Sequence, residues 1–207
     1  HILVDNLHIQ DAMSTQSFDE RLYLIASQQA GYFTTAQAEE AGVSRQQLSY
    51  HAKTGRFLRI RSGVYRLTLY PASPHEDLFV AWLAVGAHAV VSHESALSLY
   101  DLSDVLPREI HLIVPRTASR RHHGLRLHTN ALPPEDVTWF SGLPVTTVPR
   151  TIADVAASGL TEELVMQAVL QAIQRGLTTK EDLLVMAERY SGRVLQLLHR
   201  AIERASS

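Results

Sequence analysis

The stretch that decides the fold of the first third of the chain is Thr34-Thr-Ala-Gln-Ala-Glu-Glu-Ala-Gly-Val-Ser-Arg-Gln-Gln-Leu-Ser-Tyr-His-Ala-Lys-Thr54. It contains two places where Ser or Thr precedes Gln by three residues, the spacing of a capping box at a helix start: Thr34 with Gln37 and Ser44 with Gln47. The pattern predicts a short helix over residues 36–41, capped by Thr34 or Thr35, and a second helix from 45 to about 54. Gly42 is expected to end the first helix, and the side chain of Val43 is expected to be buried in the core at the turn.

Segments on both sides extend this pattern. Before it, residues 18–30 have apolar side chains at helical spacing and predict a first helix that Gly31 ends. After it, two β-prone runs at 57–60 and 64–67 flank Arg61-Ser-Gly63, which predicts a tight hairpin. The order helix, short helix, glycine turn, helix and hairpin is that of a winged helix-turn-helix.

The domain organisation follows from one break in the chain. Tyr70-Pro-Ala-Ser-Pro74 interrupts both helix and strand and predicts a linker. We therefore expect an α+β protein with a winged helix-turn-helix at 18–70 and a mixed α/β domain at 75–207 that ends in helices. Residues 1–17 are expected to be an expression-tag remnant or a disordered N-terminus, with Met13 as the natural start.

One stretch of the first domain is locally basic, although the formal net charge of the whole chain is −2. The stretch from Val43 to Arg66 contains six basic residues and no Asp or Glu. A local field of this kind binds phosphate even when the rest of a protein is acidic. Arginine supplies nearly all of the charge, and its planar fork suits phosphates and guanine edges.

The second predicted helix of the motif therefore carries the expected DNA contacts. Arg45 and Gln46 lie in its first turn, where recognition helices read base edges. Ser49, Tyr50 and Lys53 suit phosphates, and a wing arginine suits the backbone or a narrow minor groove. The full expected set is Thr35, Ser44, Arg45, Gln46, Gln47, Ser49, Tyr50, Lys53, Arg56, Arg59, Arg61 and Arg66. The alternative is that this polar face is only solvated surface.

The second domain shows alternating helical and strand-like segments. Buried strands are expected at 109–114, 125–128 and 143–148. The expected helices are 75–85, 93–99, 150–157, 162–175, 180–190 and 193–205. The apolar stripes of the later helices fit packing within the domain better than a cofactor site, and no glycine-rich phosphate loop is present.

Metal and catalytic sites are not expected. His122 and His123 are adjacent, with His111 and His128 nearby, but on a strand adjacent residues point to opposite faces, so both cannot easily bind one ion. The chain has no cysteine, which removes thiolate sites and disulfides. Asp154 is expected to pair with Arg150 at i,i+4 instead of acting as a catalytic acid. A second basic loop with Arg116, Arg120, Arg121 and Arg126 is either solvated or touches DNA or an acidic partner.

The sequence also resembles a known family. Gly31 to Leu48, the Gly55–Arg66 stretch ending in Gly-Val-Tyr-Arg, Val91-Ser-His-Glu-Ser-Ala-Leu97 and Gly142-Leu-Pro-Val-Thr-Thr-Val-Pro-Arg-Thr-Ile-Ala-Asp154 are similar to AbiEi-type antitoxins of type IV toxin–antitoxin systems. The resemblance covers most of Gly31 to Leu184. It implies a repressor that binds double-stranded DNA at its own promoter, and a second domain that counters a nucleotidyltransferase toxin without forming a stable complex.

The overall expectation is a cytoplasmic, autoregulating repressor with no enzyme activity and no cofactor. Two copies on an inverted repeat are expected, because one winged domain reads few base pairs, but the sequence leaves the oligomeric state open. No apolar run approaches the roughly 20 residues of a membrane span, so no membrane partner is expected. The alternative is an interaction module that neutralises a toxin or partner without operator binding.

Overall fold

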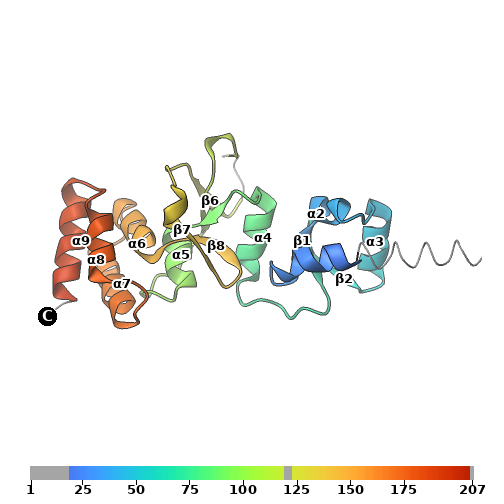
Figure 1. The fold of residues 1–207 in the computed structure, drawn as a ribbon, viewed down its shortest axis with the longest axis horizontal. Helices are drawn as coiled ribbons and strands as arrows, with labels where there is room; N and C mark the ends of the chain where they lie inside the picture. The colour runs from blue at the N-terminus through green and yellow to red at the C-terminus, as the bar shows by residue number, and fades with distance from the viewer. Residues whose placement is uncertain (1–18, 119–122, 206–207) are drawn as a thin grey trace, which may run out of the picture. The chain divides into compact units, whose positions relative to one another are not determined.

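The computed structural model describes residues 19–118 and 123–205, which form two compact units divided between Gly86 and Ala87 (Figure 1). Each unit has its own sheet. In the first unit, a helix over residues 19–27 precedes β1 (Tyr32–Thr34), α2 (Thr35–Glu40), α3 (Arg45–Lys53), β2 (Phe57–Arg61), β3 (Val64–Leu67) and α4 (Glu76–Val85).

The first unit is a winged helix-turn-helix, as the sequence predicted. Strands β2 and β3 form the expected antiparallel hairpin, and β1 pairs with β3 to complete a three-stranded sheet. The strand β1 was not expected, because its three residues carry no pattern of their own. Its register, Tyr32 opposite Arg66 and Thr34 opposite Val64, comes from the tertiary pairing.

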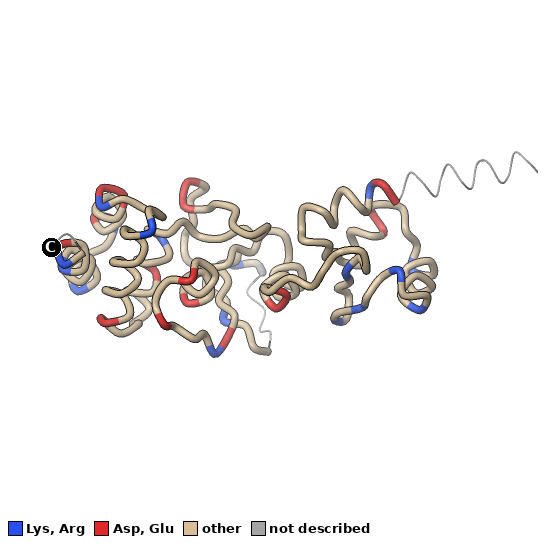
Figure 2. The backbone as a smooth tube through the Cα atoms, turned by 90° about the horizontal axis from the view of Figure 1, so that it is seen from below, with Lys and Arg blue, Asp and Glu red and all other residues tan. Residues whose placement is uncertain are grey.

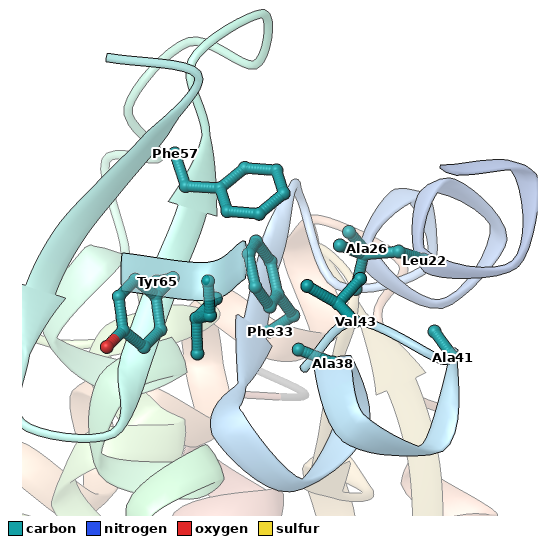
Figure 3. Packing of buried hydrophobic residues seen from close by; sticks show 9 residues of the cluster. Leu22, Ala26, Phe33, Ala38, Ala41, Val43, Phe57 and Tyr65 are labelled. Atoms are coloured by element: carbon teal, nitrogen blue, oxygen red, sulfur yellow. The ribbon is translucent and has the colours of Figure 1, made fainter. Parts of the chain in front are cut away.

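The core of this unit joins the three helices to the sheet (Figure 3). Phe33 is fully buried and packs edge-on against Phe57, with ring centroids 5.1 Å apart, and against the face of Tyr65 at 5.8 Å. Val43, in the turn between α2 and α3, is also fully buried, as the sequence predicted. These contacts fix the orientation of α3 relative to the hairpin.

Helix α4 belongs with the first unit, whereas the sequence analysis assigned its residues to the second domain. The hydroxyl of Tyr32 donates to Glu76 at 2.6 Å, and its ring stacks on Phe79 with centroids 5.2 Å apart. The proline-containing segment is held in the same way, since the backbone amide of Ser73 donates to the Tyr32 hydroxyl. The aromatic packing outweighs the two prolines that suggested a break at 70–74.

The second unit is built on a mixed five-stranded sheet in the order β6-β5-β4-β8-β7. The pairs β5/β6 and β4/β8 are parallel, and β4/β5 and β7/β8 are antiparallel. The strands are β4 (Val90–Val91), β5 (Ile110–Ile113), β6 (Leu125–His128), β7 (Val137–Phe140) and β8 (Leu143–Thr146). Strands β5, β6 and β8 were expected, and β4 and β7 were not.

In the described part of this unit, the helices that follow β4 lie against the sheet or against one another (Figure 1). Helix α5 contacts β5 and β8 on one side and α6 on the other, and α6 contacts α7, α8 and α9. Their bounds are α5 (His93–Leu99), α6 (Val148–Ala157), α7 (Glu162–Gln174), α8 (Lys180–Ala187) and α9 (Gly192–Arg204), with short 3-10 turns η1 (Arg116–Ala118) and η2 (Pro134–Asp136). Among the described residues, no helix has the length and apolarity that crossing a membrane requires.

Candidate nucleic-acid interface

Helix α3 is the element that the sequence analysis assigned to base recognition. Its first turn is closed by a complete capping box: the Ser44 hydroxyl accepts from the Gln47 amide, and the Gln47 side chain accepts from the Ser44 amide. Leu48 is buried, and Ala52 packs partly against the same core. The helix is therefore fixed along one face, and the opposite face is turned to solvent.

The exposed face of α3 carries the predicted contact residues. Successive helix positions turn by about 100°, which places the five side chains within an arc of about 140°. All five are exposed, and Tyr50 is 62% exposed although it is a large aromatic residue. These side chains are Arg45, Gln46, Ser49, Tyr50 and Lys53.

The hairpin adds two exposed arginines. A bulge interrupts the β2/β3 register between Arg59 and Arg61, and bulges bend a strand and re-aim its side chains. Gly63 occupies the hairpin turn with φ +78°, and its carbonyl accepts from the Thr35 amide at the start of α2. The wing is thereby tied to the helix-turn-helix. The stretch 43–66, which contains α3 and the wing, has basic positions and no acidic ones in the tube of Figure 2.

Other predicted residues have structural partners. Arg56 forms a 2.6 Å ion pair with Asp19 of the first helix. The guanidinium carbon of Arg66 lies 5.8 Å from the Tyr32 ring centroid, and its Nε and Nη1 atoms are buried. The side chains of Ser44 and Gln47 cap α3. The predicted basic residues that remain exposed and available for DNA are therefore mainly those of α3 and of the tip of the wing.

An acidic residue that the sequence reasoning missed lies beside this set. The Glu39 carboxylate of α2 forms an ion pair with the Nε of Arg45, whose side chain is 82% exposed. The stretch from Val43 to Arg66 is free of acid in sequence, but the turn at Gly42 brings Glu39 back against it in space. The signal was a glutamate in the last turn of the preceding helix, six residues before Arg45.

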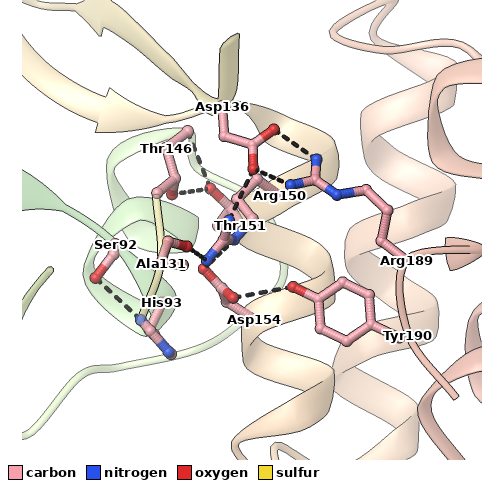
Figure 4. A network of polar contacts seen from close by, with 10 residues as sticks. All are labelled: Ser92, His93, Ala131, Asp136, Thr146, Arg150, Thr151, Asp154, Arg189 and Tyr190. Carbon is pink, nitrogen blue, oxygen red and sulfur yellow. Dashed lines mark hydrogen bonds and ion pairs between the residues drawn. The ribbon is translucent and has the colours of Figure 1, made fainter. Parts of the chain in front are cut away.

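The second unit contains a buried ionic network (Figure 4). Arg150 donates to Asp136 at 2.7 Å and to Asp154 at 2.9 Å, which includes the i,i+4 pair that the sequence predicted. Arg189 also donates to both oxygens of Asp136, and the Tyr190 hydroxyl donates to Asp154. The network joins the start of β7, helix α6 and the end of α8.

Electrostatics distinguishes the two aspartates. Burial alone would raise the pKa of Asp136, but hydrogen bonds from Arg189 and Arg150 outweigh it, so the net pKa lies below the ordinary value. Burial raises the pKa of Asp154 above its ordinary value in spite of the ion pair with Arg150. Each carboxylate is already engaged by a guanidinium, which favours a role in holding the helices together.

The second unit also gathers three histidines that the sequence analysis kept apart. His93, His111 and His128 each offer a ring nitrogen within 4.8 Å of the others. Burial lowers the pKa of all three, to about 3 for His93 and about 4 for His128, so the rings are neutral at pH 7. The expectation of no metal site was argued from the adjacent pair His122 and His123. His122, like Arg120 and Arg121, lies outside the described residues.

Comparisons with known proteins agree with this architecture. The family described as "Transcriptional regulator, AbiEi antitoxin" matches residues 20–68, and the family described as "AbiEi antitoxin C-terminal domain" matches residues 88–200. No curated protein matches the chain. Both families are defined as antitoxins or regulators, and neither is an enzyme family.

A solved structure has a similar fold. The crystal structure of the RV2827C protein from Mycobacterium tuberculosis aligns with a TM-score of 0.53 and 15% sequence identity, over 92% of this chain and 78% of that one. At this identity the likeness concerns the fold alone. The match to the C-terminal domain covers more than half of the chain, and the regulator match covers the winged unit. The protein therefore belongs to the AbiEi antitoxin family.

Proposed function

We propose that the first unit binds operator DNA, with α3 in the major groove and the β2/β3 wing along the backbone. The observation that carries this proposal is the exposure of Arg45 and Lys53 on α3, and of Arg59 and Arg61 on a wing that is tied to the helix-turn-helix. If the polar face of α3 were only solvated surface, nothing would require a capped helix, anchored to the core, beside a hairpin with exposed arginines. Family membership as a transcriptional regulator supports the same assignment.

The proposed roles follow from chemistry and position. Arg45 and Gln46, in the first turn of α3, read base edges, because arginine pairs bidentately with guanine and glutamine with adenine. Ser49, Tyr50 and Lys53 bind phosphates and fix the register. Arg59 and Arg61 contact the backbone or a narrow minor groove. The proposed set also includes Thr35 and Arg56. Thr35 lies at the start of α2, and Arg56 contributes the exposed part of its side chain.

The test is binding to DNA from the protein's own promoter region, measured by fluorescence anisotropy over a range of salt. Arg45→Ala should weaken specific binding by about 1–3 kcal/mol, or about 5- to 150-fold, and relax the preference at one base pair. Arg59→Ala should weaken binding to all sequences and lower the salt slope by about 1. The exposed Arg108 of the second unit gives a control, since Arg108→Ala removes the same charge.

A contrary result is equally clear. If Arg45→Ala, Arg59→Ala and Arg108→Ala all bind the promoter like the unmodified protein, the interface lies elsewhere. Two copies on an inverted repeat are part of the proposal, so binding to a half-site should be much weaker than binding to the full repeat.

We further propose that the protein represses its own operon in the cytoplasm and counters a nucleotidyltransferase toxin of a type IV system, without a stable complex. This part rests on membership of the AbiEi antitoxin family. Co-expression with the neighbouring gene tests it. Rescue of growth that persists in the Arg45→Ala, Arg59→Ala double variant would assign the antitoxin activity to the second unit. It would also favour the alternative of a module that neutralises a partner without operator binding.

A further inference from the structure

Three imidazoles meet on one face of the sheet of the second unit. His111 on β5 and His128 on β6 lie on the same face, because His111 is opposite Arg126 and His128 is opposite Ile113 in the parallel register. His93 comes from the first turn of α5, which packs on β5. His93 is 2% exposed and His111 is 5% exposed.

The distances between the rings are close to those of a shared metal ion. His128 Nε2 lies 3.2 Å from His111 Nδ1. Two imidazole nitrogens on one tetrahedral zinc ion lie about 3.3 Å apart, given Zn–N bonds of about 2.0–2.1 Å. The three ligand atoms all lie within 4.8 Å of one another, so the largest shift needed is about 1.5 Å. The rings of His93 and His128 stack with centroids 3.6 Å apart, so they must rotate for both lone pairs to face one ion.

The surroundings of His93 match those of a metal-binding histidine. Its Nδ1 lies 3.0 Å from the Ser92 hydroxyl, which leaves the other ring nitrogen, Nε2, to bind a metal ion. Metal-bound histidines characteristically use the other nitrogen in a hydrogen bond that fixes the tautomer. The backbone of His93 also has φ +50°, a conformation that side chains other than glycine rarely adopt and that clusters at functional sites.

We propose that His93, His111 and His128 bind one Zn²⁺ ion that ties the start of α5 to strands β5 and β6. Three imidazoles without a thiolate suit zinc, and they leave a fourth position for water or an added ligand. The charged groups around the site are mixed. Glu94 and Glu109 act favourably near His111, while Arg126 opposes a cation at all three rings and Arg150 opposes one at His93.

The test is a titration of the full chain, treated with EDTA and dialysed, with Zn²⁺ in a calorimeter and with Co²⁺ in a spectrophotometer. One ion per chain should bind, and the Co²⁺ adduct should show the visible bands of a four-coordinate nitrogen site. His128→Gln should lower the affinity at least as much as loss of an outer partner does, which is about 10- to 100-fold. The exposed His123 is the control, and His123→Gln should bind as before.

A variant that keeps all three ligands makes the test independent of folding defects. Arg126→Gln removes the opposing charge from the exposed side and should tighten zinc binding several-fold, whereas Arg108→Gln should not. Zinc should also raise the thermal midpoint of the unmodified chain and leave that of His128→Gln unchanged. Failure of the unmodified chain to bind one ion, or equal binding by His128→Gln and His123→Gln, would overturn the proposal. DNA binding does not enter these readouts, so the result is separate from the operator proposal.

Discussion

At the scale of single residues, the notable feature of the interface is that its leading arginine is already paired. Arg45 is held by Glu39, and both side chains are largely exposed. To reach a base edge, Arg45 must leave this ion pair, and an ion pair at so exposed a site is only weakly stabilising. Glu39 also places a negative charge near the phosphates. If the proposed interface is used, Glu39 should weaken binding while it holds Arg45 in the free protein.

Replacing Glu39 should consequently strengthen DNA binding. Glu39→Gln is expected to lower the dissociation constant for promoter DNA by about 1.4- to 5-fold, because the cost of breaking the pair disappears. The adjacent exposed Glu40 is the matched control, since Glu40→Gln removes the same charge without releasing Arg45. Anisotropy titrations at fixed salt measure the difference. Equal affinities for the two variants would mean that Arg45 does not move from Glu39 to the DNA.

The side-chain contacts that the sequence predicted correctly are those between residues close together in the chain. The capping pairs Thr34–Gln37 and Ser44–Gln47 are both present, as their spacing indicated. The sequence did not indicate the contacts that a side chain makes with a partner distant along the chain. Arg66 lies over Tyr32, and Arg56 reaches Asp19. No sequence pattern shows such a contact, because it exists only after the elements have packed.

At the scale of secondary-structure elements, the same distinction separates the predicted helices and strands from the missed ones. The helices have their own periodicity and caps, and all of those expected in the described residues are present within a few positions. Strands β1, β4 and β7 have two to four residues each, and their pairing with β3, β5 and β8 defines them. The histidine cluster was missed for the same reason, since its members come from α5, β5 and β6.

The turn after the first helix provides a test at this scale. Gly31 has φ +88°, and a Cβ added there would overlap the Cβ and Cγ atoms of Tyr70. Gly55 has a similar φ of +78° but open space around it. Both Gly→Ala changes incur the left-handed cost of about 1–2 kcal/mol, and Gly31→Ala adds an overlap of about 1–3 kcal/mol.

Chemical denaturation should therefore separate the two glycine variants. Gly31→Ala is expected to lose about 2–5 kcal/mol of unfolding free energy, and Gly55→Ala about 1–2 kcal/mol. The excess loss measures the packing of Tyr70 on the winged unit. If both variants lose the same amount, Tyr70 does not stay against Gly31, and the segment at 70–74 is the free linker that its prolines suggested.

At the scale of the whole molecule, the two units have different sources of stability. The winged unit has an aromatic core around Phe33, whereas the second unit adds a buried ionic network to its own buried apolar side chains. Asp136 is 4% exposed in its side chain and receives hydrogen bonds from both Arg150 and Arg189. Removing the charge of Asp136 takes one partner from Arg150 and the partner from Arg189, and breaking a buried ion pair in this way costs about 3–5 kcal/mol. The Asp136 network should thus control the stability of the second unit and leave helix α3 of the first unit unaffected.

Asp136→Asn tests this division. The variant should destabilise the thermal transition of the second unit by about 3–5 kcal/mol, while the affinity for promoter DNA at low temperature stays unchanged. The neighbouring exposed Glu135 gives the control Glu135→Gln, for which little change is expected. Because the folded pKa of Asp136 is lowered, its contribution is present above the unfolded value of about 3.9 and is lost as the pH falls through the folded pKa. The stability difference between the two proteins should therefore narrow below about pH 4; a difference that is constant with pH would mean that packing, and not the charge of Asp136, holds the helices together.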